Sequence, residues 1–417
     1  MMKVLAAIVA PPHLTVSGGA RAGEMLSAAL ASSCDMTVAN MMGVSPQFDA
    51  PIDGRRPARA AVRYTLPRLL RGAPMMARYR ALFYRSNIPQ IVSHGSFDLV
   101  HLHNPMPALE MARVAAACAA AGTPYVVSTH GFNEIANGRR IYGFGALRGA
   151  LWKRLVEDSV ARVVRGAAAV FALSPADFEI VRAMGYRGAV HIVPNGVRAP
   201  SAADAIEDAR TLQRFGIPAV REPDLTTFMF LANHTPNKGL PTLFAAFARI
   251  KEPYRLIVGG EKREGVDYEG AVGVCGPRQS VVITGQLRDE EVAALFRRSD
   301  IFVFPTSADT FPLVVLEAMS HALPVVSSDV GGIPYQLSEG CGVLTPPGDV
   351  AALTAALETL ARDPAARSAM GRLAKQRVDR EFTWESAAAL ALAAYDQALS
   401  RRPQANPVVV VRPRHAR

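Results

Sequence analysis

The sequence predicts an α/β fold with two doubly wound, Rossmann-like halves, each built on a parallel sheet. A chain of 417 residues is too long for one ordinary core, so two domains of roughly 150 to 200 residues are expected. Half of the residues are hydrophobic and 20% are charged, which indicates a packed globular protein. Short apolar runs without polar alternation recur between helical stretches, and this pattern is typical of parallel strands covered on both faces.

The first half shows this alternation from its first residues. KVLAAIVA is an apolar run, and SGGARAGEMLSAALA follows it with glycines at the turn and a helical pattern behind them. Further helices are expected within 107–121 and 148–166. The expected strands of this half are 3–10, 36–40, 99–103, 124–129, 168–174 and 190–195.

A polar, Pro-punctuated segment at 198–224 interrupts the pattern, and we interpret it as a linker that contains one helix. We therefore expect domains at 1–200 and 201–383, with a last helix at 384–400 that packs back on the first domain. The basic tail 401–417 is expected to be disordered. The expected strands of the second half are 226–234, 254–260, 281–285, 300–306, 324–329 and 342–347.

The cysteines and the apolar runs limit the class of protein. Four scattered cysteines form no C-x-x-C pair, which argues against a zinc site or a disulfide framework and favours a reducing cytoplasm. The start MMKVLAAIVAPPHL lacks the basic lead of a signal peptide, so it is expected to be a buried strand. No apolar run reaches about 18 residues, so we expect a cytoplasmic protein without a membrane-spanning helix.

The net charge of +10 is concentrated in two segments. Residues 54–97 contain nine arginines and no acid, and residues 401–417 contain five more arginines and no acid. In 54–97 the arginines are mixed with Leu, Met, Phe and Tyr, which favours docking on an anionic membrane surface. A solvated basic face is the alternative interpretation. No recognition motif for nucleic acid accompanies this charge, so nucleic acid is not an expected partner.

One candidate site follows the expected strand 300–306. The loop SADTFP leads into a helix over about 313–321, so the amino end of this helix, with the free amides of Leu313 and Val314, lies at the end of a strand. Such a helix start is an anion site, and a carboxylate such as Glu317 within the helix is placed to meet sugar hydroxyls. The competing interpretation is a plain helix cap by Asp309 or Thr310, with Glu317 on the surface.

Other candidates also follow expected strands, because ligands of open parallel sheets bind at the carboxyl ends of the strands. Lys238 precedes Gly239 at such a junction, where its ammonium group can meet a phosphate. His130 follows the strand 124–129, while His101 and His103 alternate onto one face of 99–103, where core histidines are the alternative interpretation. The chain contains neither G-x-G-x-x-G nor G-x-x-x-x-G-K-[ST], which argues against a nicotinamide fingerprint and a Walker-type loop.

Taken in order, several segments resemble signatures of the retaining GT-B glycosyltransferases of family 4, over about residues 3–400. These segments are SGGA, DLVHLH, VVSTHG, VHIVPNGV, NKGLPTLFAAF, DTFPLVVLEAM, LPVVSSDVGGIP and FTWE. The resemblance implies two Rossmann-like domains that face each other across a cleft, and a nucleotide-sugar donor. We expect a UDP-sugar, with a GDP-sugar or an ADP-sugar as the alternatives. The resemblance also implies a glycan or lipid-linked acceptor and a role in cell-surface polysaccharide or glycolipid synthesis. No cofactor and no metal site are expected, since a lysine and a helix start can neutralise a leaving diphosphate.

The resemblance also implies roles for matching positions. Asp309 and Glu317 stand at the two acidic places of an E-x7-E-like motif, with Asp309 by the donor sugar and Glu317 at the ribose. His130 stands at the donor–acceptor junction, so the expected catalytic residues are Asp309 and His130. The expected donor-binding residues are Glu317, Lys238, Leu313, Val314, Phe311, Gly18, Gly19 and Asn233.

Three positions depart from the family pattern. The first acid is Asp309, which is one methylene shorter than Glu; Asn233 and His234 stand where an Arg is usual; and Tyr335 replaces a common acid. Diphosphate neutralisation is then expected from Lys238, the helix amides and another Arg or a protonated His234. The alternatives are a weak or inactive GT-B protein that binds a sugar nucleotide, and another GT-B enzyme such as an epimerase or a phosphorylase.

Overall fold

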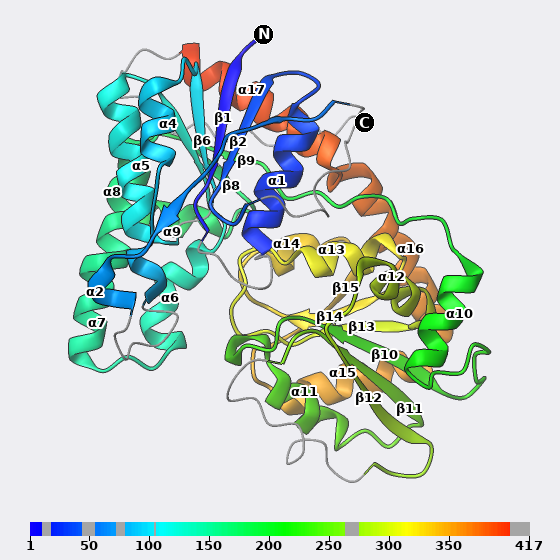
Figure 1. The fold of residues 1–417 in the computed structure, drawn as a ribbon. Helices are drawn as coiled ribbons and strands as arrows, with labels where there is room; N and C mark the ends of the chain where they lie inside the picture. Colours follow the sequence, from blue (N-terminus) through cyan, green and yellow to red (C-terminus); the bar gives the residue numbers. More distant parts are fainter. Residues whose placement is uncertain (11–17, 44–54, 72–79, 104–105, 263–274, 401–417) are drawn as a thin grey trace. The chain divides into compact units, whose positions relative to one another are not determined.

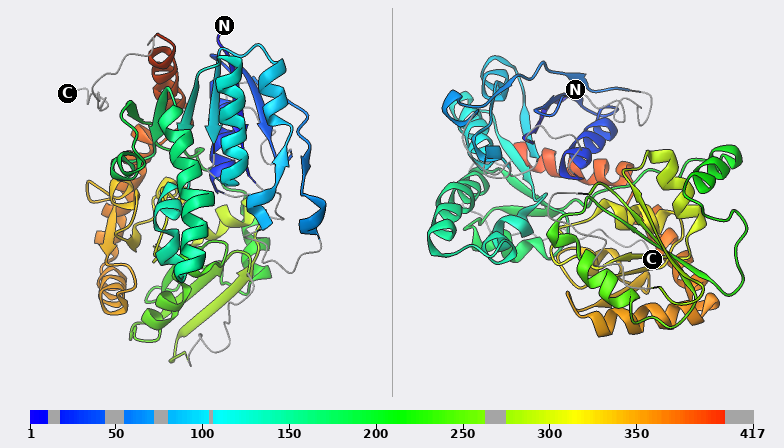
Figure 2. Two further views of the ribbon diagram at one scale, coloured as in Figure 1. Left: turned by 90° about the vertical axis from the view of Figure 1, so that its left-hand side faces the viewer. Right: turned by 60° about the horizontal axis from the view of Figure 1, so that its bottom comes forward.

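The computed structural model describes residues 1–10, 18–43, 55–71, 80–103, 106–262 and 275–400. By internal packing the chain forms two compact units: Met1–Gly196 together with the segment from Trp384 onward, and Val197–Thr383. Figure 1 shows both units as layered α/β structures, and Figure 2 shows each from two further directions. The tail 401–417, expected to be disordered, lies outside the described residues.

The first unit is built on a parallel sheet. Among the described residues seven strands pair in the order β3-β2-β1-β6-β7-β8-β9. A short antiparallel pair, β4 and β5, lies outside this sheet. The strands are β1 Lys3–Ile8, β2 Asp35–Asn40, β3 Ala58–Arg59, β4 Tyr64–Thr65, β5 Arg85–Ser86, β6 Leu99–His103, β7 Tyr125–Ser128, β8 Ala169–Ala172 and β9 Ala189–Ile192.

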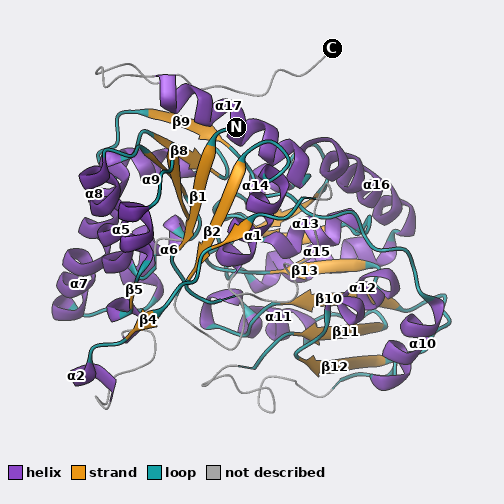
Figure 3. Cartoon of the chain, turned by 45° about the horizontal axis from the view of Figure 1, so that its top comes forward, coloured by secondary structure: helices purple, strands orange, loops and turns teal. Residues whose placement is uncertain are grey.

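Helices cover both faces of this sheet, as the purple and orange layers of Figure 3 show. Helices α5 and α8 pack together on one face, and α1 and α17 pack together on the other. The segment between α7 and α8 is a π-helical turn, Lys153–Glu157. The helices are α1 Gly18–Leu30, α2 Arg68–Arg71, α4 Ile88–His94, α5 Ala108–Ala121, α6 Phe132–Ile141, α7 Ala146–Trp152, α8 Asp158–Gly166, α9 Asp177–Ala183 and α17 Trp384–Ser400.

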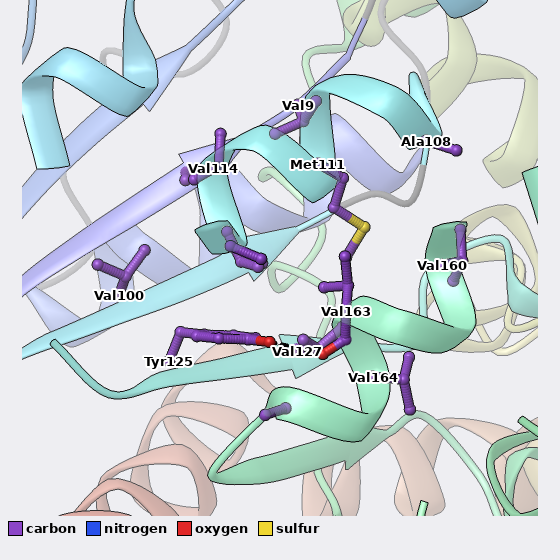
Figure 4. Close-up of a cluster of buried hydrophobic side chains, with 14 of the residues drawn as sticks. Val9, Val100, Ala108, Met111, Val114, Tyr125, Val127, Val160, Val163 and Val164 are labelled. Atoms are coloured by element: carbon purple, nitrogen blue, oxygen red, sulfur yellow. Dashed lines mark hydrogen bonds between the residues drawn. The ribbon is translucent and has the colours of Figure 1, made fainter. Parts of the chain in front are cut away.

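The core of the first unit lies between the sheet and the α5–α8 face (Figure 4). Val100 and Val127 on the strands meet Met111 and Val114 of α5, and all four side chains are fully buried. Tyr125 closes the cluster, because its hydroxyl donates to the carbonyl of Val163, 2.7 Å away. Burying side chains of this size contributes about 1.5 to 3 kcal/mol each, so the sheet is a rigid support for the loops at its edge.

The second unit repeats the architecture. Its six described strands pair in parallel in the order β12-β11-β10-β13-β14-β15, the order of a Rossmann sheet. The strands are β10 Thr226–Leu231, β11 Tyr254–Gly259, β12 Gln279–Gly285, β13 Ile301–Phe304, β14 Val325–Ser328 and β15 Gly342–Thr345. The helices are α10 Ala205–Arg214, α11 Leu240–Phe247, α12 Asp289–Arg298, α13 Leu313–Ser320, α14 Ile333–Gln336, α15 Val350–Arg362 and α16 Pro364–Glu381.

The main elements confirm the strand and helix positions expected from the sequence, to within a few residues at the ends. Two details differ. Gly18 and Gly19 are the first residues of α1 rather than part of the turn before it. The short strands β3, β4 and β5 lie within the arginine-rich segment, which has no apolar run long enough to predict a strand.

Candidate active site

Three loops of the second unit converge at the carboxyl ends of β10, β13 and β14. Gly239, with a φ of +75°, follows Lys238, and a Cβ at this position would lie 1.8 Å from the carbonyl oxygen of Pro305. Gly331, with a φ of +55°, follows β14, and a Cβ there would lie 1.9 Å from the carbonyl oxygen of Asp309. Only glycine permits both the left-handed backbone and these close approaches, so the two glycines pack the loops around Asp309.

Lys238 and Asp309 form an ion pair at this point. The Lys238 Nζ donates to both carboxylate oxygens of Asp309, at 2.8 and 2.9 Å. The Thr306 hydroxyl also donates to Asp309 Oδ2 at 2.7 Å. The side chains of Lys238 and Asp309 are 21% and 16% exposed, so the pair is half-buried and still reachable from solvent. The structure thus brings together two residues that the sequence placed after different strands.

The amino end of α13 lies directly beyond Asp309. Pro312 precedes the helix with an extended backbone, and the first helical residues are Leu313 and Val314. The amides of a first helical turn have no acceptor inside the helix, so these two are available to an anion. Glu317 is partly exposed within the same helix.

The ring of Phe311 is a packing group. It is 5% exposed, lies edge-on against Phe382 at 5.8 Å between ring centroids, and is 6.5 Å from the ring of Tyr335. Tyr335, at the position where an acid was expected, belongs to this aromatic cluster, and burial raises the pKa of its hydroxyl. The ring of Phe311 is therefore part of the packing ahead of α13.

The residues at the position of the usual arginine do not replace its charge. His234 is fully buried, its Nε2 lies 3.1 Å from the carbonyl oxygen of Gly259, and burial lowers the pKa of its ring. A protonated His234 is therefore not a source of positive charge near neutral pH, contrary to that expectation. Asn233 is half-buried beside it. Among the described residues of the loops after β10 and β13, Lys238 is the positively charged group beside the amino end of α13.

In the first unit, His130 follows β7 at the carboxyl end of the sheet. The preceding residue, Thr129, donates through its hydroxyl to Asp177 Oδ2 at 2.5 Å, and the amide of Leu173 donates to the same oxygen at 2.8 Å. Burial raises the pKa of Asp177 to about 6, against these hydrogen bonds, which lower it. This network fastens the turn that carries His130 to the start of α9. Burial lowers the pKa of His130 to about 4, so its ring is neutral at pH 7.

His101 and His103 lie on the face of the sheet that α1 and α17 cover. Their ring centroids are 3.8 Å apart, as their alternation along the strand predicted. A Cβ at Gly23 of α1 would lie 3.0 Å from Cγ of His103, so the helix packs closely on this ring. Gly18 and Gly19 begin the same helix, and residues 11–17 before them lie outside the described part of the chain.

Sequence reasoning missed the residues that support these side chains. Asn237 holds the loop of Lys238 to the end of β13: its carbonyl accepts from the Ser307 amide at 2.7 Å, and its side chain donates to the Ala308 carbonyl at 3.0 Å. Thr306 supports the candidate acid, because its hydroxyl donates to Asp309. Asp177 supports the candidate histidine, because it accepts from Thr129, the residue before His130. Thr306 lies two residues after β13, whereas Asn237 lies in the turn before α11 and Asp177 begins α9, and many residues of such loops and helix starts share these places.

Comparison with known families identifies the chain. Residues 226–363 match the family described as "Glycosyl transferases group 1", and residues 16–199 match "Glycosyltransferase Family 4". The chain belongs to these group 1, family 4 glycosyltransferases. Its two parallel-sheet units are the Rossmann-like domains of the GT-B fold.

Individual relatives agree with this family. A D-inositol 3-phosphate glycosyltransferase of Xylanimonas cellulosilytica is 30% identical over 224 residues, 51% of this chain and 52% of the relative. The enzyme of the same name from Arthrobacter sp. is 27% identical over 360 residues, 83% of this chain and 79% of the relative. The first of these matches therefore spans about half of the relative's length.

Solved structures share the fold of this chain. The structure of Anabaena Alr3699/HepE in complex with UDP and glucose superposes with a TM-score of 0.68 at 16% identity, over 95% of this chain and 100% of that chain. Among the described residues, no helix combines the length and the apolar character needed to cross a membrane.

Proposed function

We propose that this protein transfers a hexosyl group from a nucleotide sugar to a glycan or lipid-linked acceptor with retention of anomeric configuration. The observation that carries the proposal is the Lys238–Asp309 pair beside the amino end of α13, at the carboxyl ends of β10 and β13. A cation, free helix amides and a carboxylate at one sheet edge match a leaving diphosphate and a sugar that gains positive charge.

The proposed roles follow the family pattern residue by residue. Lys238 and the amides of Leu313 and Val314 bind the diphosphate, Glu317 binds the ribose hydroxyls, and Asp309 lies by the donor sugar. Phe311 and Asn233 line this donor site, while Gly18 and Gly19 lie near the phosphates. His130, with a neutral ring, contacts the sugar at the donor–acceptor junction. The leaving group is stabilised by Lys238 and the helix start, so these residues supply the charge that the reaction needs.

A UDP-sugar is the proposed donor. The support is that HepE, which shares the fold, was solved with UDP and glucose, and that the curated relatives are named as glycosyltransferases. We further propose that the product belongs to cell-surface polysaccharide or glycolipid synthesis at the inner face of the cell membrane. A lipid-linked acceptor brings an enzyme to that surface.

The decisive experiment incubates the protein with a panel of nucleotide sugars and follows nucleotide release with and without candidate acceptors. Release that needs both a donor and an acceptor supports transfer, and Lys238→Met should reduce it at least tenfold. Proton NMR of the product then reads the anomeric configuration, and an inverted product contradicts retention. Binding of a nucleotide without release from any donor supports the alternative, a binding protein without turnover, which rests on the shorter acid Asp309 and on Asn233 and His234 in place of the usual arginine.

An anionic membrane surface is the second proposed partner. Leu69 of α2 is 92% exposed, and Leu147 and Leu151 of α7 are 76% and 52% exposed. Both helices lie at the same end of the first unit (Figures 1 and 3). Exposed arginines, Arg68 and Arg71 among them, flank these leucines. Apolar side chains among cations fit the interface of an anionic bilayer.

Vesicle sedimentation tests this partner. The protein should bind vesicles that contain phosphatidylserine or phosphatidylglycerol, and binding should fall as salt rises. Leu147→Glu should reduce binding, whereas Val220→Glu, at a 79% exposed position of the second unit, should not. Equal binding to neutral vesicles contradicts the electrostatic part of the proposal.

A further inference from the structure

Three imidazoles stand in a row in the first unit. The ring centroids of His101 and His103 are 3.8 Å apart with planes tilted by 32°, and those of His103 and His130 are 5.8 Å apart with planes at 28°. The rings come from neighbouring strands, β6 and the end of β7. His101 is fully buried, His103 is 1% exposed and His130 is 5% exposed, so all three rings are buried and His130 keeps the largest exposed fraction.

The buried end of this row is fixed by two hydroxyl groups. His101 Nδ1 lies 2.7 Å from the Tyr395 hydroxyl, and its Nε2 lies 2.7 Å from the Ser128 hydroxyl. A neutral imidazole has one donor and one acceptor nitrogen, and a hydroxyl can donate or accept, so the two hydroxyl partners satisfy both nitrogens and fix the plane of the ring. Burial lowers the pKa of His101 well below its usual value, which keeps the ring neutral. Tyr395 is itself buried in α17 and stacks on Phe171 at 5.6 Å.

The middle ring is held by packing. Within the described residues, Nδ1 of His103 is buried and has no hydrogen-bond partner. Gly23 allows α1 to approach its Cγ and Cβ, so the ring is clamped between the helix, His101 and His130. A buried imidazole nitrogen without a partner is costly compared with an apolar ring of the same shape. Stability alone does not account for a histidine at this place.

We propose that His103 is a positioning residue, which transmits the fixed orientation of His101, anchored by Tyr395 and Ser128, to the imidazole of His130. The Thr129–Asp177 network holds the backbone of the same turn, so the ring and the backbone of His130 are supported from different sides. Tyr395 lies on α17, far along the sequence from β7. By this route it helps to set the orientation of the His130 ring after β7. This inference rests on the proposed role of His130 at the sugar.

The experiment compares Tyr395→Phe, His103→Phe and His103→Leu with a matched control. Tyr395→Phe removes the hydroxyl from His101 and keeps the ring on Phe171. His103→Phe keeps a ring in the stack, and His103→Leu removes it. The control is Tyr125→Phe, which removes another buried tyrosine hydroxyl of the same unit, the one that donates to the Val163 carbonyl. Thermal unfolding verifies that each variant folds.

The first readout is spectroscopic and needs no turnover. The ring signals of His130, assigned through a His130→Gln variant of the histidine-labelled protein, should shift or broaden in Tyr395→Phe and in His103→Leu. They should stay in place in Tyr125→Phe. Unchanged His130 signals in both His103→Leu and Tyr395→Phe overturn the proposal.

The second readout is kinetic. Tyr395→Phe and His103→Leu should lower kcat at least tenfold while the donor KM changes less than about threefold, and His103→Phe should lie between them and the wild type. Tyr125→Phe should keep kcat within about twofold. An equal loss of kcat in the control and in Tyr395→Phe indicates a merely structural role and overturns the proposal. A different result separates the two proposals: the His130 ring signals shift in Tyr395→Phe and His103→Leu, but His130→Gln turns over normally. The positioning by His103 is then supported, and the proposed role of His130 in transfer is contradicted.

Discussion

Replacing Asp309 with asparagine separates two functions of the Lys238–Asp309 pair. The exchange keeps the shape of the side chain, keeps an oxygen for the Thr306 hydroxyl and removes the negative charge. In the wild type, a diphosphate that binds Lys238 as proposed must compete with Asp309 for Lys238 Nζ. We therefore expect Asp309→Asn to bind UDP more tightly than the wild type, although it should turn over more slowly.

The magnitude follows from the geometry of the pair. At about 3 Å and an effective dielectric constant of about 20, two unit charges attract each other by roughly 5 kcal/mol. Desolvation and residual screening remove most of this attraction, since the side chains are 21% and 16% exposed, and a net contribution of about 1.4 kcal/mol remains. That free energy corresponds to a tenfold increase in UDP affinity. If Asp309 stabilises the charge that develops on the sugar, turnover should fall by roughly a hundredfold or more.

Isothermal titration with UDP measures the affinity, and a parallel nucleotide-release assay measures turnover. The matched control is Asp208→Asn, because Asp208 pairs with Arg297 in the same unit and the two side chains are 22% and 24% exposed. This control should lose comparable stability and keep its UDP affinity. Weaker or unchanged UDP binding by Asp309→Asn refutes the reasoning, since it means that the carboxylate does not compete with the nucleotide for Lys238.

Three further predictions concern other residues of the two domains. Glu317→Ala should weaken UDP binding by about tenfold in titration calorimetry through loss of a charge-assisted contact to the ribose, and should leave the melting temperature nearly unchanged; equal affinity removes Glu317 from the site. Gly239→Ala should lower the free energy of unfolding by at least about 2 kcal/mol in urea titrations, because it combines a left-handed backbone with a clash against the Pro305 carbonyl; a neutral effect contradicts the close approach. Asp177 has a folded-state pKa raised to about 6, so its contribution to stability is present below the unfolded pKa of 3.8 and is lost as the pH rises through 6. Its share of the unfolding free energy should fall by about 2 kcal/mol between pH 4 and pH 7, and Asp177→Asn should remove that slope; equal pH profiles of both proteins contradict the assignment.

The strand and loop positions were predictable because buried parallel strands are apolar along their whole length. The strand AVFA at Ala169–Ala172 and the helix that begins at Leu313 lie where the pattern placed them. The same logic directed attention to strand ends, where Lys238 and Asp309 lie. The two-residue strand Ala58–Arg59 was not predictable, since a pair of residues in an arginine-rich segment has no periodicity.

The pairing of side chains that are distant in the sequence could not be predicted, for a different reason. Lys238 and Asp309 are 71 positions apart, and His101 and Tyr395 are 294 positions apart. Which partner each chooses depends on loop geometry set by glycines such as Gly331, and no local pattern encodes that geometry. The neutral state of His234 follows in the same way from burial, which is a property of the whole unit.

The Lys238–Asp309 pair also bears on how a reaction cycle in this protein would end. With the diphosphate contact that we propose, Lys238 has two competing partners after the sugar has left: the nucleotide product and the Asp309 carboxylate, which it binds in the structure. As the nucleotide dissociates, the Asp309 carboxylate binds the Lys238 ammonium group again. The cation is therefore paired both before and after product release. An internal carboxylate of this kind weakens product inhibition and shortens the residence time of the spent nucleotide, which favours turnover where product release limits the rate.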